Sequence, residues 1–364
     1  MNIRYGLIGS GMMGQEHIRN IRLLENTVVT AIADPDPAMR EISSKNCGGT
    51  AKLYADYRDM LSDDICDAYL IVSPNDTHYG ILLDVLPGNK PILCEKPLCT
   101  TSKHCREIIA ASKGRTAPIW VAMEYRYMPP VQRLLEEMAS GTSGPVQMMS
   151  IREHRFAFLP KVGDWNRFNE RTGGTLTEKC CHFWDLMRFA LQSDPVRVYA
   201  SGAMNINHID ERYEGRVPDI IDNAYVIVDF ENGTRGMLDL CMFAEGSHWQ
   251  EVISVVGPKA RIDACVPGPA RFRKDGSEQH SRIVISDRGK KQEIIHEVVV
   301  DNAILQAGDH HGSSFYQHQK FAEMVRSGNT IPEIDLEDGL WAVRVGEAAE
   351  RSARTGQAIE LDQV

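Results

Sequence analysis

A glycine-rich turn near the beginning of the chain is the feature that most restricts its fold. Gly9, Gly11 and Gly14 form a Gly-x-Gly-x-x-Gly pattern between an apolar segment at residues 4–9 and a helical pattern at residues 15–25. In such a turn the first glycine permits the tight bend, the second lets a pyrophosphate approach the backbone, and the third lets the helix pack on the strand. This context predicts a Rossmann domain that binds a dinucleotide, with its phosphates at the helix N-terminus.

The end of the next apolar segment, residues 28–34, indicates which dinucleotide is bound. Asp34 lies 20 residues after Gly14, where a carboxylate accepts hydrogen bonds from the ribose hydroxyls of NAD and repels the 2′-phosphate of NADP. We therefore predict NAD as the cofactor, and we count the nearby Arg40 among the residues that contact it. Two further candidates at the glycine-rich turn are Met12 and Met13.

The first part of the chain alternates apolar strands with helical patterns. The expected strands occupy residues 4–9, 28–34, 68–73, 91–95 and 119–124. Alternation of this kind is typical of a parallel, doubly wound sheet. We therefore expect an α/β Rossmann domain over residues 1–123.

The second part of the chain, residues 124–364, has a different pattern, in which strands follow one another. After a helix at 131–139, the expected strands are residues 146–154, 196–204, 224–230, 236–243, 251–256 and 281–285, and helices follow at 314–326 and 336–355. Runs of strands with few helices favour an antiparallel sheet. We predict an α+β domain built on a large, open, mostly antiparallel sheet, with the C-terminal helix able to pack back on the first domain.

Charge and cysteine content limit the class of protein. The 364-residue chain has a net charge of -10 and no long run of Lys or Arg, which argues against a nucleic-acid partner. It has neither a secretory leader pattern nor an apolar segment of membrane-spanning length, so we expect no membrane partner. Its nine cysteines are odd in number and form no Cys-x-x-Cys pair, which indicates reduced thiols and a cytoplasmic location.

Five further segments carry a resemblance to one enzyme family. They are the Ser-Pro-Asn-Asp-Thr-His run at residues 73–78, the Cys-Glu-Lys-Pro run at 94–97, the Glu-Tyr-Arg-Tyr-Met-Pro run at 124–129, and the segments at 173–185 and 338–356. With the glycine-rich turn, this order of motifs resembles the Gfo/Idh/MocA family, the glucose–fructose oxidoreductase and inositol dehydrogenase group, over nearly the whole chain. The resemblance implies NAD-dependent chemistry at a sugar or polyol carbon, and a homodimer or homotetramer formed through the large sheet.

The resemblance also implies roles for individual residues. Lys96 corresponds to a family lysine that reaches toward both substrate and nicotinamide. Glu178 and His182 correspond to the acidic residue and the histidine of the family's catalytic helix. The family more often has aspartate at the first of these positions, so Glu178, with its longer side chain, is a departure. The remaining cofactor-binding candidates are Ser73, Asn75, His78, Glu95, Lys96 and Arg126.

The residue types around position 178 support the same chemistry without the resemblance. Glu178 and His182 are one helical turn apart and face one direction, and Lys179 and Asp185 continue this polar stripe. Oxidation of an alcohol needs a proton acceptor, and the ordinary pKa of histidine suits that role near neutral pH. Lys96 would polarise the same oxygen, and Glu178 would orient the sugar. The alternatives are a solvated charged face, a structural histidine and a lysine in a surface turn.

A basic and aromatic stretch before the expected catalytic helix adds candidates for substrate binding. Trp165 could stack on a sugar ring, and cations such as Arg152, Lys161 and Arg167 could bind a carboxylate, sulfonate or phosphate. The alternative is a strand edge and loop with solvated charges. The full set of predicted substrate-binding residues is Lys96, Arg152, His154, Trp165, Arg167, Glu178, Lys179, His182 and Tyr316.

The charge of the substrate has two interpretations at this point. Five cations close to the catalytic helix in an acidic chain favour a substrate with an anionic group. They are Arg152, Arg155, Lys161, Arg167 and Lys179. In the other interpretation Glu153, Asp164 and Glu170 neutralise these cations and the sugar is uncharged.

The Asp-His-His run at residues 309–311, which precedes Tyr316, contains metal-ligating residue types. Its spacing is not typical of a metal site. We expect a substrate-pocket loop or a helix cap here, and we predict no metal.

Three functions fit these residues. The first is NAD-dependent oxidation of a CH–OH group of a sugar, sugar acid or cyclitol by hydride transfer to the nicotinamide. The second is a redox-neutral glycosidase of the same family, which oxidises transiently, eliminates the aglycone and re-reduces, on an anionic sugar such as a sulfosugar. The third, a non-enzymatic dinucleotide sensor, is disfavoured because both Lys96 and His182 are present. We predict the dehydrogenase.

Overall fold

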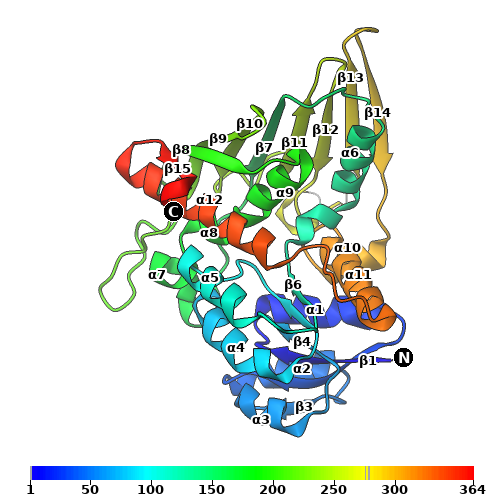
Figure 1. Cartoon of the computed structure of the whole chain (residues 1–364), viewed down its shortest axis with the longest axis vertical. Coiled ribbons are helices and arrows are strands. Elements are labelled where there is room, and N and C mark those ends of the chain that lie inside the picture. The colour runs from blue at the N-terminus through cyan, green and yellow to red at the C-terminus, as the bar shows by residue number, and fades with distance from the viewer. Residues whose placement is uncertain (1, 275, 278) are drawn as a thin grey trace.

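A parallel sheet of six strands forms the lower part of the computed structural model, which describes residues 2–274, 276–277 and 279–364 (Figure 1). The strand order is β3-β2-β1-β4-β5-β6, and all neighbours are parallel. This order is that of the doubly wound dinucleotide-binding fold. The strands are β1 (Ile3–Ile8), β2 (Thr27–Ala33), β3 (Lys52–Tyr54), β4 (Ala68–Ile71), β5 (Ile92–Cys94) and β6 (Ile119–Val121).

Helices connect these strands, and short polar side chains begin several of them. Asp36, Asp56 and Thr101 each accept a hydrogen bond from a backbone N–H in the first turn of the helix that follows. The first helix differs, because Gly11 precedes it and provides no side-chain cap. The helices are α1 (Met12–Leu23), α2 (Pro37–Asn46), α3 (Tyr57–Asp63), α4 (His78–Val85) and α5 (Ser102–Ala111).

The second sheet has nine strands in the order β14-β13-β12-β11-β7-β10-β9-β8-β15. Only β7 and β10 are parallel neighbours, so the sheet is mostly antiparallel, as predicted. Three of its strands, β12, β14 and β15, were not among the expected ones. The strands are β7 (Met148–His154), β8 (Pro195–Ala203), β9 (Asn223–Phe230), β10 (Arg235–Cys241), β11 (Glu251–Val256), β12 (Ala260–Val266), β13 (Ser281–Asp287), β14 (Gln292–Val298) and β15 (Ile359–Glu360).

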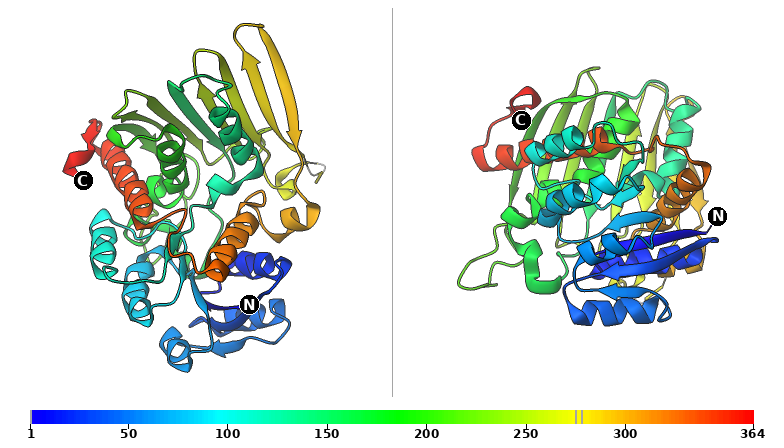
Figure 2. Two further views of the ribbon diagram at one scale, coloured as in Figure 1. Left: turned by 45° about the vertical axis from the view of Figure 1, so that its right-hand side comes forward. Right: turned by 60° about the horizontal axis from the view of Figure 1, so that its bottom comes forward.

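Helices cover one face of this sheet. The helix α6 (Pro129–Ala139) contacts β12 and β13, α9 (Cys181–Leu191) contacts β7, and α12 (Leu336–Thr355) contacts β8. Figure 2 shows the sheet as an open layer with these helices on the side that faces the Rossmann sheet. Along β9, buried and exposed residues alternate, as expected for a sheet that buries only one face.

Segments from the end of the chain pack against the first sheet. The helix α11 (Ser313–Ser327) contacts α1 and β1, and α12 contacts α5 and β6 as well as the second sheet. Both helices appear in orange and red between the two sheets in Figure 1. The remaining helices are α7 (Asn169–Thr172), α8 (Thr175–Glu178) and α10 (Asn302–Ala307).

The catalytic helix expected over residues 173–185 is two segments. The short helix α8 ends at Glu178, and α9 begins at Cys181, after an interruption at Lys179 and Cys180. Glu178 and His182 therefore lie on either side of a helix junction. The single continuous stripe that the one-turn spacing indicated does not form, because Asp185 turns away to bind Arg126.

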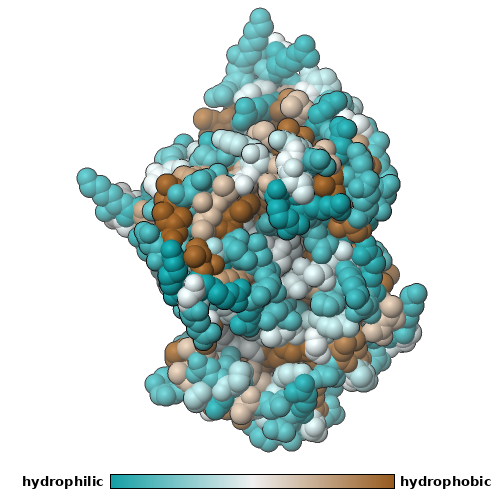
Figure 3. Space-filling view, turned by 90° about the vertical axis from the view of Figure 1, so that its left-hand side faces the viewer, coloured by the Kyte–Doolittle hydropathy of each residue, from teal (hydrophilic) through white to brown (hydrophobic). Residues whose placement is uncertain are grey.

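The surface carries mixed polar and apolar residues. In the face drawn in Figure 3, apolar side chains gather in several separate patches among polar ones. Across the described parts of the chain, no helix is both long enough and apolar enough to span a bilayer.

Candidate active site

A cavity of about 960 Å³ opens where the parallel strands of the first sheet end. Its wall includes the residues that follow β1, β2, β4 and β5, and the strand order changes direction between β1 and β4. Ligands of doubly wound sheets bind at this change of direction. The predicted cofactor residues that line the cavity are Gly9, Gly11, Met12, Met13, Asp34, Ser73, Asn75, Glu95 and Lys96.

The glycine-rich turn has the shape that a dinucleotide needs. Gly9 has a φ of +93°, and a Cβ there would lie 2.7 Å from the backbone nitrogen of Ser73. Gly11 faces open space, so a ligand can approach its backbone. A Cβ on Gly14 would come within 3.1 Å of the Gly9 carbonyl oxygen. The uncapped N-terminus of α1 leaves N–H groups for an anion, so these residues fit the pyrophosphate of a dinucleotide.

Asp34 is fixed at the end of β2 by backbone hydrogen bonds. Its Oδ2 accepts a hydrogen bond from the Ser10 backbone N–H at 2.7 Å, and its Oδ1 accepts one from the Asp36 N–H at 2.9 Å. The carboxylate is 8% exposed and lines the cavity. Oδ2 also accepts a hydrogen bond from the Ser10 hydroxyl at 3.1 Å. Oδ1 has one donor and can accept a further hydrogen bond, so Asp34 is placed to receive a ribose hydroxyl.

Four predicted cofactor residues lie outside the cavity lining: Gly14, Arg40, His78 and Arg126. The Arg40 guanidinium donates to the Asp34 and Pro35 carbonyl oxygens. The His78 ring lies 2.9 Å from the Pro97 carbonyl oxygen and 3.1 Å from that of Ser73. His78 therefore ties two cavity loops together, and its contact with the cofactor stays a prediction.

Arg126 belongs to a structural ion-pair network. Its Nε and Nη2 donate to the two carboxylate oxygens of Asp185 at 2.7 and 2.5 Å, and Nη2 lies 3.2 Å from Asp338 Oδ2. The side chain joins the 3-10 turn at 124–127, α9 and α12. A bidentate pair of this kind fixes the orientation of the elements that it connects.

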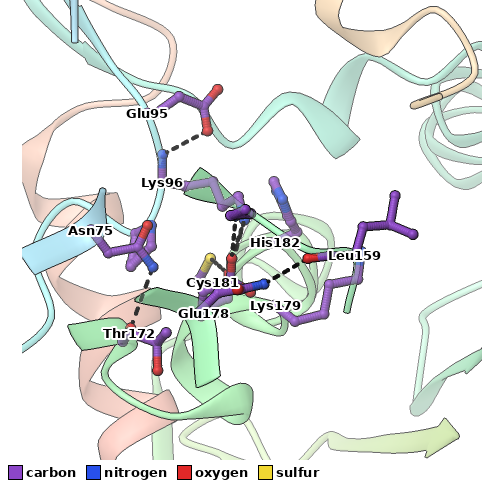
Figure 4. Close-up of polar contacts among 12 residues, drawn as sticks. Asn75, Glu95, Lys96, Leu159, Thr172, Glu178, Lys179, Cys181 and His182 are labelled. Atoms are coloured by element: carbon purple, nitrogen blue, oxygen red, sulfur yellow. Dashed lines mark hydrogen bonds and ion pairs between the residues drawn. The ribbon is translucent and has the colours of Figure 1, made fainter. Parts of the chain in front are cut away.

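Lys96 and Glu178 meet at the end of the cavity near the second sheet (Figure 4). The Lys96 ammonium donates to the Glu178 backbone carbonyl at 3.0 Å and lies 3.8 Å from Glu178 Oε1. Lys161 approaches the same carboxylate oxygen at 3.5 Å, and its ammonium lies 4.4 Å from the centre of the Trp165 ring. The structure thus brings together three predicted segments of the sequence. They contribute Lys96, the pair Lys161 and Trp165, and Glu178.

The Glu178 carboxylate and the Lys96 ammonium hold each other in charged form. Burial alone would raise the pKa of Glu178, but Lys96 and Lys161 lower it to about 2. Burial would lower the pKa of Lys96, but surrounding carboxylates, Glu178 first, raise it above its ordinary value. Burial lowers the pKa of Lys161, against the effect of Glu178.

His182 is buried beside Tyr125, outside the lining of the cavity. The two rings stack with their centres 4.2 Å apart and their planes 8° from parallel. The imidazole Nδ1 faces Glu124 Oε2 at 3.7 Å, which is too long for a direct hydrogen bond. Burial first, and then the charges of Lys96 and Lys179, hold the pKa of His182 well below 6.5. His182 is therefore neutral at physiological pH.

Lys179 connects the stacked rings of His182 and Tyr125 to two glutamates on the second sheet. Its ammonium donates to the Tyr125 hydroxyl at 2.7 Å and lies 2.9 Å from Glu153 Oε1. Glu153 on β7 and Glu251 on β11 are directly opposite each other in the antiparallel ladder. Burial, followed by repulsion from Glu153, raises the pKa of Glu251 to about 7. Arg155 adds a second cation at 3.3 Å from Glu153.

Four predicted substrate residues are not brought to this cluster. Arg152 and His154 alternate with the inward-facing Glu153, so they lie on the other face of the sheet, where His154 contacts Asp239 at 3.1 Å. The guanidinium of Arg167 pairs with Glu211 at 2.9 Å. The fourth, Tyr316, packs near Gly312 at the start of α11. Strand alternation could have excluded Arg152 and His154, because a sheet that buries one face separates neighbouring residues.

The Asp-His-His run at 309–311 sends its three side chains to different partners. His310 Nδ1 lies 2.7 Å from Glu16 Oε1 on α1, Asp309 pairs with Arg271, and His311 contacts the Ser281 hydroxyl. Glu16 raises the pKa of His310 to about 9 against the effect of burial. Among the described residues, no group of three His, Cys, Asp or Glu side chains is arranged to hold a metal ion.

Two family models cover most of the chain. Residues 3–123 match the model described as "Oxidoreductase family, NAD-binding Rossmann fold". Residues 136–361 match the one described as "Oxidoreductase family, C-terminal alpha/beta domain". The chain belongs to the Gfo/Idh/MocA family. It is an oxidoreductase with an NAD-binding Rossmann domain, as the glycine-rich turn and Asp34 predicted.

Curated Gfo/Idh/MocA relatives include two full-length matches. The chain is 25% identical to myo-inositol 2-dehydrogenase of Thermotoga maritima, over 100% of this chain and 99% of that protein. It is also 25% identical to inositol 2-dehydrogenase of Rhizobium meliloti, over 99% and 100% of the two chains.

Solved structures of similar fold include ligand complexes. A levoglucosan dehydrogenase in complex with NADH and levoglucosan has a TM-score of 0.81 at 19% identity, covering 100% of both chains. An oxidoreductase from Agrobacterium radiobacter in complex with NAD+, L-tartaric acid and magnesium has a TM-score of 0.80 at 18% identity, covering 100% of this chain and 99% of that one. These likenesses concern the fold.

Within this Gfo/Idh/MocA site, sequence reasoning missed several residues that contact the histidine or its neighbours. Tyr125 and Glu124 stand in the run at 124–129, which carried the resemblance at the domain junction but was given no site role beyond Arg126. Glu153 and Glu251 are 98 positions apart and meet through strand register. A glutamate among apolar inward positions of a strand was the one local signal that could have pointed to Glu153.

Proposed function

We propose that the protein is an NAD-dependent dehydrogenase that oxidises a CH–OH group of a sugar, sugar acid or cyclitol. The observation that carries this proposal is the placement of Lys96, whose ammonium lies at the wall of the dinucleotide cavity and is held by the Glu178 carbonyl at 3.0 Å. Glu124 Oε2 and His182 Nδ1 are buried polar atoms without a hydrogen-bond partner in the described structure, and both residues lie outside the cavity lining. Buried polar groups of this kind are costly unless a ligand or water satisfies them. The names of the two inositol dehydrogenase relatives support the same substrate class.

Lys96 would polarise the oxygen of the reacting hydroxyl. Its ammonium lies at the wall of the cofactor cavity and is held there by the Glu178 carbonyl. A fixed ammonium next to the oxygen stabilises the negative charge that develops as the proton leaves. When bound, NAD would supply the nicotinamide that accepts the hydride.

His182 would accept the hydroxyl proton. Its depressed pKa keeps the imidazole neutral, and stacking on Tyr125 fixes the plane of the ring. Its Nδ1 lies 3.7 Å from Glu124 Oε2, and burial, followed by repulsion from Glu95, raises the pKa of Glu124 to about 7.

Glu178 would bind a substrate hydroxyl and anchor the two lysines. It is the position at which the family more often has aspartate, and here its carboxylate is shared by Lys96 and Lys161. The longer side chain brings this carboxylate closer to the cavity by one methylene group, so the substrates accepted should differ from those of relatives with aspartate.

The test is the absorbance of NADH with a panel of hexoses, sugar acids and cyclitols. A dehydrogenase accumulates NADH in step with oxidised sugar, whereas a redox-neutral glycosidase releases an aglycone without accumulating NADH. We expect Lys96→Ala and His182→Ala to lose about two orders of magnitude or more in turnover, while each still binds NAD. Aglycone release without net NADH, or near-normal turnover in both variants, would refute the proposal.

A further inference from the structure

Cations near the catalytic segment differ in how they are neutralised. Arg155 and Lys179 both pair with Glu153, at 3.3 and 2.9 Å. Arg167 pairs with Glu211 at 2.9 Å, and Arg152 lies on the outer face of the sheet. These four do not reach the cavity lining. An anionic substrate therefore cannot be inferred from them.

Lys161 has a different environment. Its ammonium lies 3.5 Å from Glu178 Oε1, and the same oxygen lies 3.8 Å from the Lys96 ammonium. Both lysines line the cavity, with side chains 18% and 14% exposed. Two ammoniums thus share one carboxylate at the wall where substrate and nicotinamide would meet.

The other cations of the described cavity lining already have partners. Arg58 and Arg171, the remaining cations of the described lining, pair with Asp84 and Asp76, each at 2.9 Å. Glu95 is held by His17 at 2.9 Å. Glu170, one of the acids expected to neutralise the basic stretch, pairs with Arg216 at 2.7 Å. Lys96 and Lys161 therefore differ from the other cations of the described lining, because they share the one Glu178 carboxylate.

We propose that the substrate carries an anionic group that Lys161 binds, while its reacting hydroxyl lies at Lys96. This inference rests on the proposed dehydrogenase function. Because both ammoniums lie within 4 Å of one carboxylate oxygen, a single sugar ring can reach both of them. Trp165 also lines the cavity, and its ring holds the Lys161 ammonium at 4.4 Å from the ring centre. The anionic group is a carboxylate, sulfonate or phosphate.

The experiment compares matched sugars that differ in charge alone. A neutral hexose is measured beside its 6-carboxy, 6-sulfo and 6-phospho analogues, as kcat/KM for NADH formation at low and high salt. Wild-type protein should prefer at least one charged sugar by roughly ten- to hundred-fold, the scale of a charge-assisted hydrogen bond. That preference should shrink as salt rises. The analogue with the largest preference identifies which anion is recognised.

Variants assign the preference to one residue. Lys161→Met should reduce the charged-to-neutral ratio roughly ten- to hundred-fold. Lys113→Met is the matched control, because Lys113 is an exposed lysine after α5 and outside the cavity lining. It should leave the ratio unchanged. Calorimetric titration of the NAD-saturated protein with the same sugars provides a second readout that does not need turnover.

Two results would contradict the anion-binding role of Lys161 without contradicting the proposed dehydrogenase function. One is NADH formation with equal efficiency on neutral and charged sugars, unaffected by salt. The other is a Lys161→Met protein with weaker NAD binding and an unchanged sugar preference, which would assign Lys161 to the cofactor phosphates. Absence of NADH with every sugar, together with charged-sugar binding that Lys161→Met abolishes, would instead refute the dehydrogenase and retain the anion site.

Discussion

At the scale of single residues, the environment of His182 explains how a buried imidazole can act as a base. Tyr125 stacks on the ring, and Lys179 donates to the Tyr125 hydroxyl. Burial disfavours the imidazolium, and the ammoniums of Lys96 and Lys179 disfavour it further. A base with a depressed pKa is active over a wide range, because activity is lost only when the pH falls through that pKa.

Lys179→Met should move the acid limb of the pH–rate profile upward. In the wild type the pKa of His182 is well below 6.5, so kcat/KM should stay level as the pH falls through 6.5. Removal of the Lys179 charge removes a repulsion and leaves Glu153 paired with Arg155 alone, and both effects raise the pKa of His182. Lys179→Arg keeps the charge and should keep the acid limb nearer its wild-type position. An acid limb that stays in place or moves downward in Lys179→Met would contradict this interpretation.

Asp34 should determine the preference for NAD over NADP. Its carboxylate lines the cavity and is held by the backbone of Ser10 and Asp36. Asp34→Ser should weaken NAD binding and relax the discrimination against NADP, since both the hydroxyl contacts and the repulsion of a 2′-phosphate are lost. Dissociation constants for the two cofactors provide the check. Tighter NADP than NAD binding by the wild type would show that the assignment of Asp34 is wrong.

At the scale of elements, α12 holds the short helix α8 in place. Glu350 on α12 accepts a hydrogen bond from the Leu176 backbone N–H at 2.8 Å. One turn earlier, Gly346 lets the backbones come close, since a Cβ there would lie 2.6 Å from Thr177 Oγ1 and 2.9 Å from the Leu176 carbonyl oxygen. Because α8 ends at Glu178, this contact sets the position of the carboxylate that the two lysines share.

Gly346→Ala should therefore reduce both stability and turnover. The added methyl group has to displace α8, and overpacking of this kind typically costs about 1–3 kcal/mol of unfolding free energy. Denaturant unfolding and NADH formation are the measurements. Gly246→Ala is the control, since Gly246 lies in an exposed turn with open space around it. A Gly346→Ala protein with wild-type stability and turnover would mean that α8 does not depend on this contact.

Elements with a strong local signal were predictable, and those that depend on distant partners were not. The glycine-rich turn, β1 and α1 follow from spacing and periodicity within some twenty residues. The split of the catalytic helix into α8 and α9 has no such signal, because Glu350 and Gly346, more than 150 positions away, help to position α8. The same holds for the site: the Glu178–His182 spacing is local, whereas the contacts of Lys161 with Glu178 and of Glu153 with Glu251 require the tertiary fold.

At the scale of the whole molecule, the outer face of the second sheet carries a row of exposed apolar side chains. Tyr199 on β8, Ile227 on β9 and Met237 on β10 are neighbours across the ladder, with exposures of 43%, 48% and 42%. Tyr225 on the same face of β9 is 64% exposed. A contiguous apolar row of this kind is unusual on a monomer, so we expect a second copy of the chain to cover it.

Ile227→Glu should therefore shift the protein toward the monomer. A carboxylate in the middle of an apolar interface has to be desolvated without a partner, which is strongly unfavourable. Sedimentation or light scattering should find a dimer or tetramer for the wild type and for Lys113→Glu, which places the same charge away from this face. A monomeric wild type would contradict the expectation.

The central claim is that the protein transfers a hydride from a sugar carbon to NAD in the cavity beside Lys96 and His182. Its most direct measurement is the mass of the NADH formed from the best substrate of the panel, carrying deuterium at the carbon that is oxidised. We predict NADH that is heavier by one deuterium in the wild type, with formation of this product lost in Lys96→Ala. NADH without the label, or label exchanged into water while NADH does not accumulate, would contradict direct hydride transfer and with it the proposed function.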